Sequence, residues 1–383
     1  MSRKPGAFPR ILHLHSTFSA GGKELRCARL INAFGPRVEH SIGSAEPERM
    51  EAAKHISASI PVRYPADLPT LVGRPTPGRL QRLARAMAGY DLILTYNWGA
   101  MDAVMAHTLF GEALGLPRLI HHEDGFNADE RDKLKWGRNW YRRIALGRAS
   151  GLVVPSETLE RIALEVWDQP IGRVRHIPNG VDTARFGKRC RADALRGVVK
   201  RPDELWVGTL AGLRPVKNLT RLVRAFAGLP AQWQLVIVGE GPEREAIRAQ
   251  ALQLGIEHRV HLPGFASDPA RFAGLFDIFA LSSDSEQAPI SLIEAMAAGC
   301  AVASTDVGDV AAMVAEPNRP FIAANEAGLG AALSALATDA NLRSSLGEAN
   351  RARAREAFDE KAMIAAYRRL YSSALGGDGL PKP

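Results

Sequence analysis

Short apolar segments alternate with helix-like segments along this chain, and after a polar interval the same alternation begins again. In the first half, the expected strands are residues 11–15, 91–96, 118–121, 152–155 and 174–178. In the second half, they are residues 205–210, 234–239, 260–262, 276–281 and 301–304. Strands that alternate with helices form parallel sheets with right-handed crossovers. The sequence therefore predicts an α/β fold with two doubly wound domains in tandem.

The boundary between the two domains is expected near the turn Asn179-Gly180-Val181-Asp182, which is followed by a polar, basic segment. A chain of 383 residues is also too long for one ordinary core. We predict a first domain over residues 1–185 and a second over residues 186–358. Two such domains that face each other would form a cleft, and clefts between domains favour ligand sites.

Composition and charge exclude several classes of protein. No apolar run reaches the roughly 20 residues of a membrane helix, and we expect a cytoplasmic protein. The cysteines Cys27, Cys190 and Cys300 lie far apart and form no CxxC pair, so neither a zinc cage nor a disulfide framework is expected. Only 7% of the residues are aromatic, and the sequence has no cluster of basic and aromatic residues. Nucleic-acid binding is therefore not expected.

The net charge of +8 comes from basic residues dispersed over helical segments such as residues 79–85 and 133–143. Solvated helix faces explain this pattern, and peripheral docking of the helices between residues 131 and 148 on an anionic membrane is the alternative.

Two carboxylates flank the predicted start of the helix over residues 289–298. Glu286 precedes the helix. Glu294 lies about five residues into it, roughly 7 Å along the helix axis from its start. Between them are Gln287, Ala288, Pro289 and Ile290. Free amides at a helix start bind phosphate or sugar oxygens, and two carboxylates accept hydrogen bonds from hydroxyls. A solvated position is the alternative for Glu286, whereas Glu294 needs a partner because its helix is otherwise apolar.

A second group of candidates follows the strand over residues 205–210. The fork of Arg214 and the point charge of Lys217 together suit a diphosphate, although no Walker A motif is present. A solvated basic loop is the alternative. The turn at Gly239 either contacts the same ligand or only reverses the chain.

The first half contributes two further loops. Gly21 and Gly22 follow the first strand, where they either approach a phosphate or sugar or make a tight strand-to-helix turn. The segment His121-His122-Glu123-Asp124 follows another strand and lacks the spacing of a metal site. We interpret this segment as a polar loop that touches substrate.

Together these segments resemble the retaining family-4 glycosyltransferases, which have the GT-B architecture of two Rossmann-like domains that face each other across a cleft. The likeness is densest over residues 177–314. It depends on Ile177-Pro178-Asn179-Gly180-Val181-Asp182, Arg214, Lys217, Val238-Gly239-Glu240-Gly241-Pro242, Leu262-Pro263-Gly264-Phe265 and the pair Glu286 and Glu294.

This resemblance implies a nucleotide diphosphate sugar as donor, a glycan, a lipid-linked molecule or a small molecule as acceptor, and no metal or other cofactor. Arg214 and Lys217 would hold the diphosphate, Glu294 the ribose, and Glu286 would face the transferred sugar. Residues near Gly264 would border the base. The final helix, within residues 359–383, would pack back on the first domain.

The sequence departs from the family pattern at two positions. A histidine that the family places beside the donor sugar corresponds to His121, His122 or Asp124, and Gln287 replaces a common glycine. A GT-B sugar-nucleotide epimerase and a non-catalytic sugar-nucleotide binding protein are the alternative functions.

Overall fold

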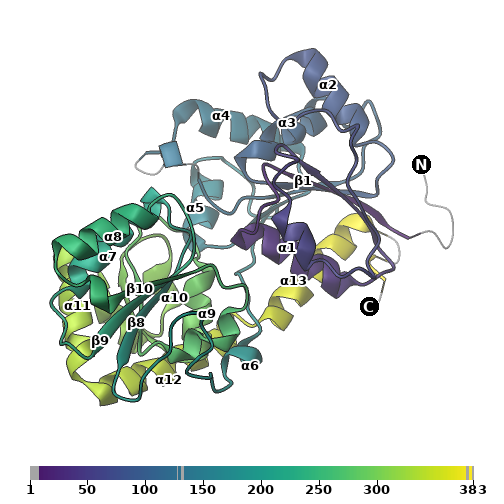
Figure 1. Ribbon diagram of the computed structural model, residues 1–383. Coiled ribbons are helices and arrows are strands. Elements are labelled where there is room, and N and C mark those ends of the chain that lie inside the picture. Colours follow the sequence, from purple (N-terminus) through teal and green to yellow (C-terminus); the bar gives the residue numbers. More distant parts are fainter. Residues whose placement is uncertain (1–7, 127, 131–132, 377–378, 382–383) are drawn as a thin grey trace. The chain divides into compact units, whose positions relative to one another are not determined.

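The computed structural model describes residues 8–126, 128–130, 133–376 and 379–381. Contacts within the chain divide it into two compact units, Met1–Ile177 with Met363–Pro383 and Pro178–Ala362 (Figure 1). The boundary predicted after residue 185 lies inside the second unit. The physical reason is that Val181 forms a parallel bridge with Asp359, and the Thr183 hydroxyl donates to the Asp359 carboxylate at 2.6 Å.

The first unit has a seven-stranded parallel sheet in the order β3-β2-β1-β4-β5-β6-β7. Its strands are β1 (Arg10–His15), β2 (Glu39–Ser44), β3 (Val62–Arg63), β4 (Leu92–Tyr96), β5 (Leu119–His122), β6 (Gly151–Val154) and β7 (Val174–His176). Five of these strands were predicted. The sequence of β2 gave no apolar signal, and this strand is buried because it pairs with β1 on one side and with β3 on the other.

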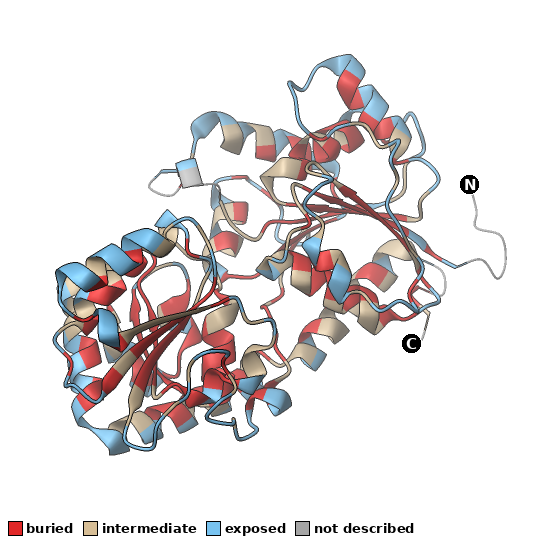
Figure 2. Cartoon of the chain, viewed as in Figure 1, coloured by how far each residue is buried: buried red, intermediate tan, exposed pale blue. Residues whose placement is uncertain are grey.

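Helices cover both faces of this sheet, and its central strands β1, β4, β5 and β6 are almost wholly buried (Figure 2). The helices of the unit are α1 (Gly22–Phe34), α2 (Pro77–Ala86), α3 (Met101–Phe110), α4 (Trp136–Ala145), α5 (Glu157–Glu165) and, from Met363 onward, α13 (Glu360–Leu375). Successive strand residues point to opposite faces. Leu12 and Leu14 therefore join the core beneath α2 and α3, whereas Ile11 joins the core beneath α1 and α13.

The second unit has a six-stranded parallel sheet in the order β10-β9-β8-β11-β12-β13. Its strands are β8 (Leu205–Leu210), β9 (Trp233–Val238), β10 (Val260–Gly264), β11 (Ile278–Leu281), β12 (Ala301–Thr305) and β13 (Ile322–Ala323). Its helices are α6 (Thr183–Phe186), α7 (Leu219–Phe226), α8 (Arg244–Gln253), α9 (Ile290–Ala298), α10 (Val310–Met313), α11 (Glu326–Thr338) and α12 (Ala340–Ala357).

In both sheets the strand order reverses beside the first strand, because the next strands in sequence are added on one side of it and the later ones on the other. β1 is flanked by β2 and β4, and β8 is flanked by β9 and β11. Open parallel sheets bind ligands beyond the carboxyl ends of the strands at such a switch point. The loops that follow β1 and β4, and those that follow β8 and β11, are therefore the places where each unit is expected to carry a site.

No helix in the described part of the chain is both long enough and apolar enough to cross a bilayer.

Candidate active site

The loops after β8 and β11 bring two of the predicted residues together. Lys217 Nζ lies 2.5 Å from Glu286 Oε1, and the Ser283 hydroxyl donates to the same oxygen at 2.7 Å. The two charged side chains keep 16% and 10% of their surface exposed. The pair is thus ordered by the protein yet accessible from solvent. An anionic ligand can compete with Glu286 for the ammonium group of Lys217.

The position of Lys217 is fixed by residues that the sequence did not single out. The Asp284 carboxylate accepts hydrogen bonds from the side chains of Arg221 at 2.6 Å and Asn218 at 3.1 Å. The backbone amide of Asp284 donates to the Val216 carbonyl. Asn218 has a left-handed backbone with φ of 43°, a conformation that asparagine tolerates better than most residues. These contacts tie the loop after β8 to the loop after β11.

The segment that leads into α9 is held from two sides. The Asn179 side chain donates to the Ala288 carbonyl at 3.0 Å, and the Asp309 amide donates to the Gln287 carbonyl at 2.9 Å. A Cβ atom on Gly308 would lie 2.4 Å from the Glu286 carbonyl oxygen, so only glycine permits this approach. Pro289 is the N-cap residue. The first amides of α9 lack a preceding helical turn and remain available to an anion.

Glu294 and Arg214 differ in their surroundings. Glu294 is only 8% exposed within the otherwise apolar α9. Arg214 lies on the surface, and within the described residues its guanidinium makes no hydrogen bond or ion pair. The carboxyl edge of the second unit therefore offers an ordered Lys217, a free Arg214 and helix-start amides for an anionic group.

The turn after β9 supports this loop by close backbone packing. Gly239 and Gly241 have φ angles of 149° and 155°, and a Cβ on Gly239 would lie 1.8 Å from the Ala211 carbonyl oxygen. The Gly239 amide donates to the Gly264 carbonyl at 3.0 Å. Phe265, which follows Gly264, leaves 62% of its surface exposed. This exposed aromatic ring is a candidate for stacking on a base, a role that the motif around Gly264 did not single out.

In the first unit, Gly21 is the N-cap of α1 and Gly22 is its first residue. The backbone of Gly21 is extended, but a Cβ there would lie 2.6 Å from a carboxylate oxygen of the buried Glu24. A side chain at this position would therefore displace the Glu24 carboxylate at the carboxyl end of β1. This finding agrees with the tight-turn interpretation and leaves a contact with the donor as a prediction.

Of the three candidates for the position beside the donor sugar, only Asp124 reaches the surface. His121 and His122 are buried in β5. His122 bonds to the Thr95 carbonyl and the Tyr371 hydroxyl, so both ring nitrogens are occupied, and burial lowers its pKa to about 3. Burial alone would raise the pKa of Asp124, but a two-point ion pair with Arg26, at 2.5 and 2.8 Å, holds that pKa below its ordinary value.

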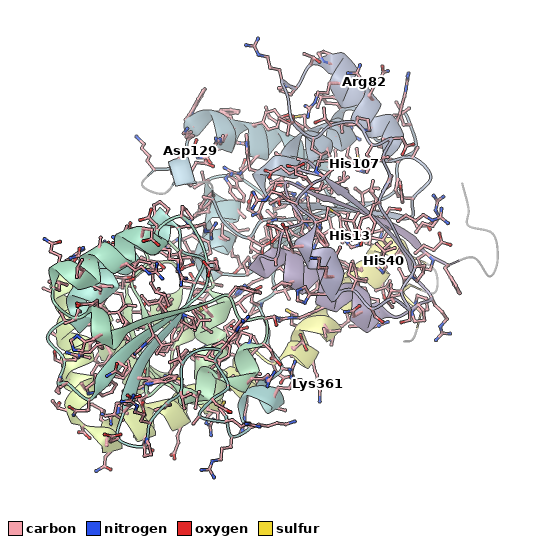
Figure 3. All side chains as sticks on the ribbon, viewed as in Figure 1. His13, His40, Arg82, His107, Asp129 and Lys361 are labelled. Atoms are coloured by element: carbon pink, nitrogen blue, oxygen red, sulfur yellow. The ribbon has the colours of Figure 1, made fainter. Side chains whose placement is uncertain are left out.

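The structure also gathers side chains that sequence spacing kept apart. His13, His15 and Cys27 each place a possible metal-ligating atom within 4.8 Å of the others. His13 in addition bonds to His40 at 2.9 Å, and both are labelled in Figure 3. Burial lowers the pKa values of the histidines and raises that of Cys27 to about 12. These groups therefore form a neutral cluster inside the first unit.

Two protein-family models match the chain. Glycosyltransferase Family 4 matches residues 20–185, and Glycosyl transferases group 1 matches residues 193–353, so that together they include most of both units. The chain belongs to the family-4 glycosyltransferases. This membership confirms the resemblance that was inferred from the motifs.

Among relatives of this family-4 chain, EpsF of Bacillus subtilis is 30% identical over 231 residues, which are 52% of this chain and 56% of EpsF. The GDP-mannose-dependent alpha-(1-6)-phosphatidylinositol monomannoside mannosyltransferase of Mycobacterium tuberculosis is 31% identical over 63% of this chain. The matched region is 65% of that protein. The chain thus spans between half and two thirds of the length of these curated relatives.

Solved structures show the same fold. The structure of HepE from Anabaena in complex with UDP and glucose has a TM-score of 0.77 and covers 95% of this family-4 chain and 100% of HepE, at 20% identity. The structural likeness confirms the predicted α/β fold with two Rossmann-like domains of the GT-B type.

Proposed function

We propose that this protein transfers a sugar from a nucleotide diphosphate sugar to a hydroxyl group of an acceptor, with retention of the anomeric configuration. The observation that carries the proposal is the pair of Lys217 and Glu286 beside the start of α9, at the switch point of the second sheet. The name of the mycobacterial relative gives a GDP-mannose donor, and HepE was crystallised with UDP-glucose. Both support a nucleotide diphosphate sugar for this chain.

The charged groups of this edge suit the departing diphosphate. Arg214, Lys217 and the first amides of α9 would stabilise the negative charge that develops on the leaving oxygen. With Lys217 drawn to the phosphates, Glu286 becomes free to accept hydrogen bonds from the sugar. Glu294 is proposed to bind the ribose, and Phe265 to stack on the base.

The reaction would exchange one bond to the anomeric carbon for another. The bond from this carbon to the phosphate oxygen breaks, and a bond to the acceptor oxygen forms on the same face. The acceptor proton moves to the leaving phosphate. Because positive side chains and amides carry the charge stabilisation, we propose that no metal ion takes part. Contacts of Gly21, Gly22 and Asp124 with the donor sugar stay predictions.

The acceptor is proposed to be a glycan or a lipid-linked molecule. The name of the mycobacterial relative includes phosphatidylinositol monomannoside, a glycosylated lipid. On α4, Trp136, Trp140 and Ile144 are exposed at helical spacing, and the Arg143 guanidinium lies 5.4 Å from the Trp140 ring. An aromatic stripe with basic neighbours suits the surface of an anionic membrane, so we propose peripheral contact through this helix.

A panel of nucleotide diphosphate sugars tests the proposal in two steps. Stabilisation against heat identifies the donor, because a ligand that binds only the folded state raises the melting temperature. Product analysis with that donor then determines the anomeric configuration. An inverted product would contradict retention, and loss of all turnover with a chelator, reversed by metal, would contradict metal independence.

A further inference from the structure

Two adjoining cavities lie in the first unit, and the mechanism above uses neither. The inner cavity has a volume of about 600 Å³ and the outer one about 650 Å³. Ala45 and Leu71 line both of them, so the cavities meet at these residues. Volumes of this size are typical of sites for small molecules.

The inner cavity is apolar. It lies between β1, β2 and α2, and no charged side chain is among the described residues that line it. Its walls include Leu14, Ile42, Met50, Leu68, Leu83 and Met87. A sugar hydroxyl buried here would find few partners, and its desolvation would be unfavourable. Hydrocarbon is the chemistry that this cavity fits.

The outer cavity has the opposite character. Its lining includes the aromatic rings of Trp98 and Tyr141 together with the charged groups of Asp102, Lys135 and Arg138. The Tyr141 hydroxyl donates to Asp102 at 2.6 Å, and the Arg138 guanidinium lies 5.1 Å from the Trp98 ring. Rings beside donors and acceptors of both charges suit a sugar, which presents an apolar face and hydroxyl groups.

One long segment forms a wall of both cavities. Residues 64–76, between β3 and α2, contain no helix or strand and line the inner cavity with Tyr64 and Leu68 and the outer cavity with Gly73. Arg79 fixes this segment by donating to the Thr70 carbonyl at 3.1 Å and to Asp102 at 2.5 Å. Irregular segments of this length are typical of binding loops.

We infer that the two cavities together bind one amphiphilic acceptor, with its hydrocarbon part in the inner cavity and its sugar in the outer one. The outer cavity includes Ser16, which directly follows β1 at the switch point of the first sheet. The sugar end of the acceptor would therefore lie at the edge of the sheet where ligands bind. The role of this ligand as an acceptor rests on the proposed function, but its binding can be measured without a donor.

Binding of the fluorescent amphiphile anilinonaphthalene sulfonate, with and without competing glycosides, tests the inference. Octyl β-glucoside below its micellar concentration should displace the probe, and methyl β-glucoside should not. Ala86 lines the inner cavity from α2, and Ala86→Phe should obstruct it and weaken both probe and octyl glucoside binding by about tenfold or more. Ala88→Phe is the matched control, because Ala88 is exposed and does not line the cavity.

Equal binding by the wild type and Ala86→Phe would overturn the inference. If Ala86→Phe does not fold, Ala53→Phe obstructs the same cavity from another segment. A protein that loses amphiphile binding in these variants but transfers no sugar would refute the proposed function and leave the amphiphile site standing. If the protein transfers sugar but the variants bind the amphiphile as the wild type does, the amphiphile site is refuted and the proposed function stands.

Discussion

At the scale of single residues, Lys217 has the most direct chemical role in this account. Its ammonium group pairs with Glu286 at rest and would turn to the diphosphate in the reaction. Lys217→Ala should lower kcat/KM by about 10²- to 10³-fold, the usual effect of removing one group that stabilises a developing oxyanion. Initial rates at varied donor concentration measure this loss.

The control for Lys217→Ala is Arg248→Ala, which also removes one surface cation of the second unit, from α8. Its rates should match the wild type. Melting curves should show that both variants fold, since Lys217 is partly exposed. Near-normal turnover of Lys217→Ala would remove the lysine from the mechanism.

His15 provides a second prediction at this scale. Its ring is buried, stacks on Tyr96 with a centroid distance of 3.9 Å, and has no hydrogen bond in the described part of the chain. Burial places its pKa well below the ordinary value. As the pH falls below about 6.5, the unfolded state binds a proton that the folded state does not, so the wild type loses stability.

His15→Phe keeps the stacked ring and removes this titration. The free energy of unfolding should therefore fall less steeply for the variant than for the wild type, by up to about 1.4 kcal/mol per pH unit between roughly pH 6 and 4. Denaturant titrations at several pH values measure both slopes. Identical slopes would show that the folded protein protonates His15 as readily as the unfolded chain does.

The site residues that could be predicted were those that lie close together in the sequence. Glu286, Pro289 and Glu294 belong to one loop and helix, so spacing along the helix predicted their neighbourhood. Asp284 and Gly308 act through contacts with other loops, which the sequence does not reveal. His122 resembled a loop residue, but it lies inside β5, whose neighbours on both sides and both faces exclude solvent.

At the scale of elements, the start of α9 depends on the loop after β12. Gly308 has a φ angle of 56° and lies against the Glu286 and Gln287 carbonyls. Gly308→Ala should destabilise the protein by about 1–3 kcal/mol and should also displace Glu286, so that transfer activity falls. Thermal unfolding and initial rates measure the two effects.

A matched substitution separates backbone strain from this collision. Gly255 has a similar φ angle of 67°, but a Cβ there would meet nothing within 4 Å. Gly255→Ala should therefore cause only the strain of a left-handed backbone, about 1 kcal/mol, with normal activity. If both variants lose the same stability and activity, the packing of Gly308 on the Glu286 loop has no functional importance.

Helix α4 gives a second prediction at this scale. Trp136 exposes 75% of its surface, and its ring lies 6.0 Å from that of Trp140. The double variant Trp136→Ala/Trp140→Ala should bind phosphatidylglycerol vesicles at least about tenfold more weakly, because two aromatic rings no longer enter the interface. Sedimentation with vesicles measures binding, and phosphatidylcholine vesicles should bind weakly throughout.

The control for α4 replaces Leu252 and Leu254 by alanine. These leucines are also exposed, but they lie at the end of α8 in the second unit. Their loss should not change vesicle binding. Equal binding by both double variants would contradict a membrane role for α4.

Elements were predictable where their own residues carried the signal. β4 and β11 read as apolar runs because both faces of a parallel sheet are covered. β2 has the sequence Glu39-His40-Ser41-Ile42-Gly43-Ser44 and shows no such run; its burial is imposed by its neighbours. The stop of α9 at Gly299 was predicted correctly, and this residue has the left-handed backbone of a helix end.

At the scale of the whole molecule, the repeated alternation in the sequence corresponds to two sheets, each with helices on both of its faces. This repetition was enough to predict the fold class, because only parallel sheets with crossover helices explain it. The end of each unit was less predictable. The chain leaves the first unit after Ile177 and returns to it at Met363, and the pairing of Val181 with Asp359 joins the two passages within the second unit.

The account as a whole assigns diphosphate binding to the second unit, through Lys217, Arg214 and the start of α9. Calorimetric titration of UDP and GDP into the wild type and into the double variant Arg214→Ala/Lys217→Ala tests this assignment most directly. We predict saturable binding of at least one nucleotide to the wild type and a loss of about 100-fold or more in the variant, as expected for two cations on one diphosphate. Equal affinity of the two proteins for the nucleotide would contradict the account.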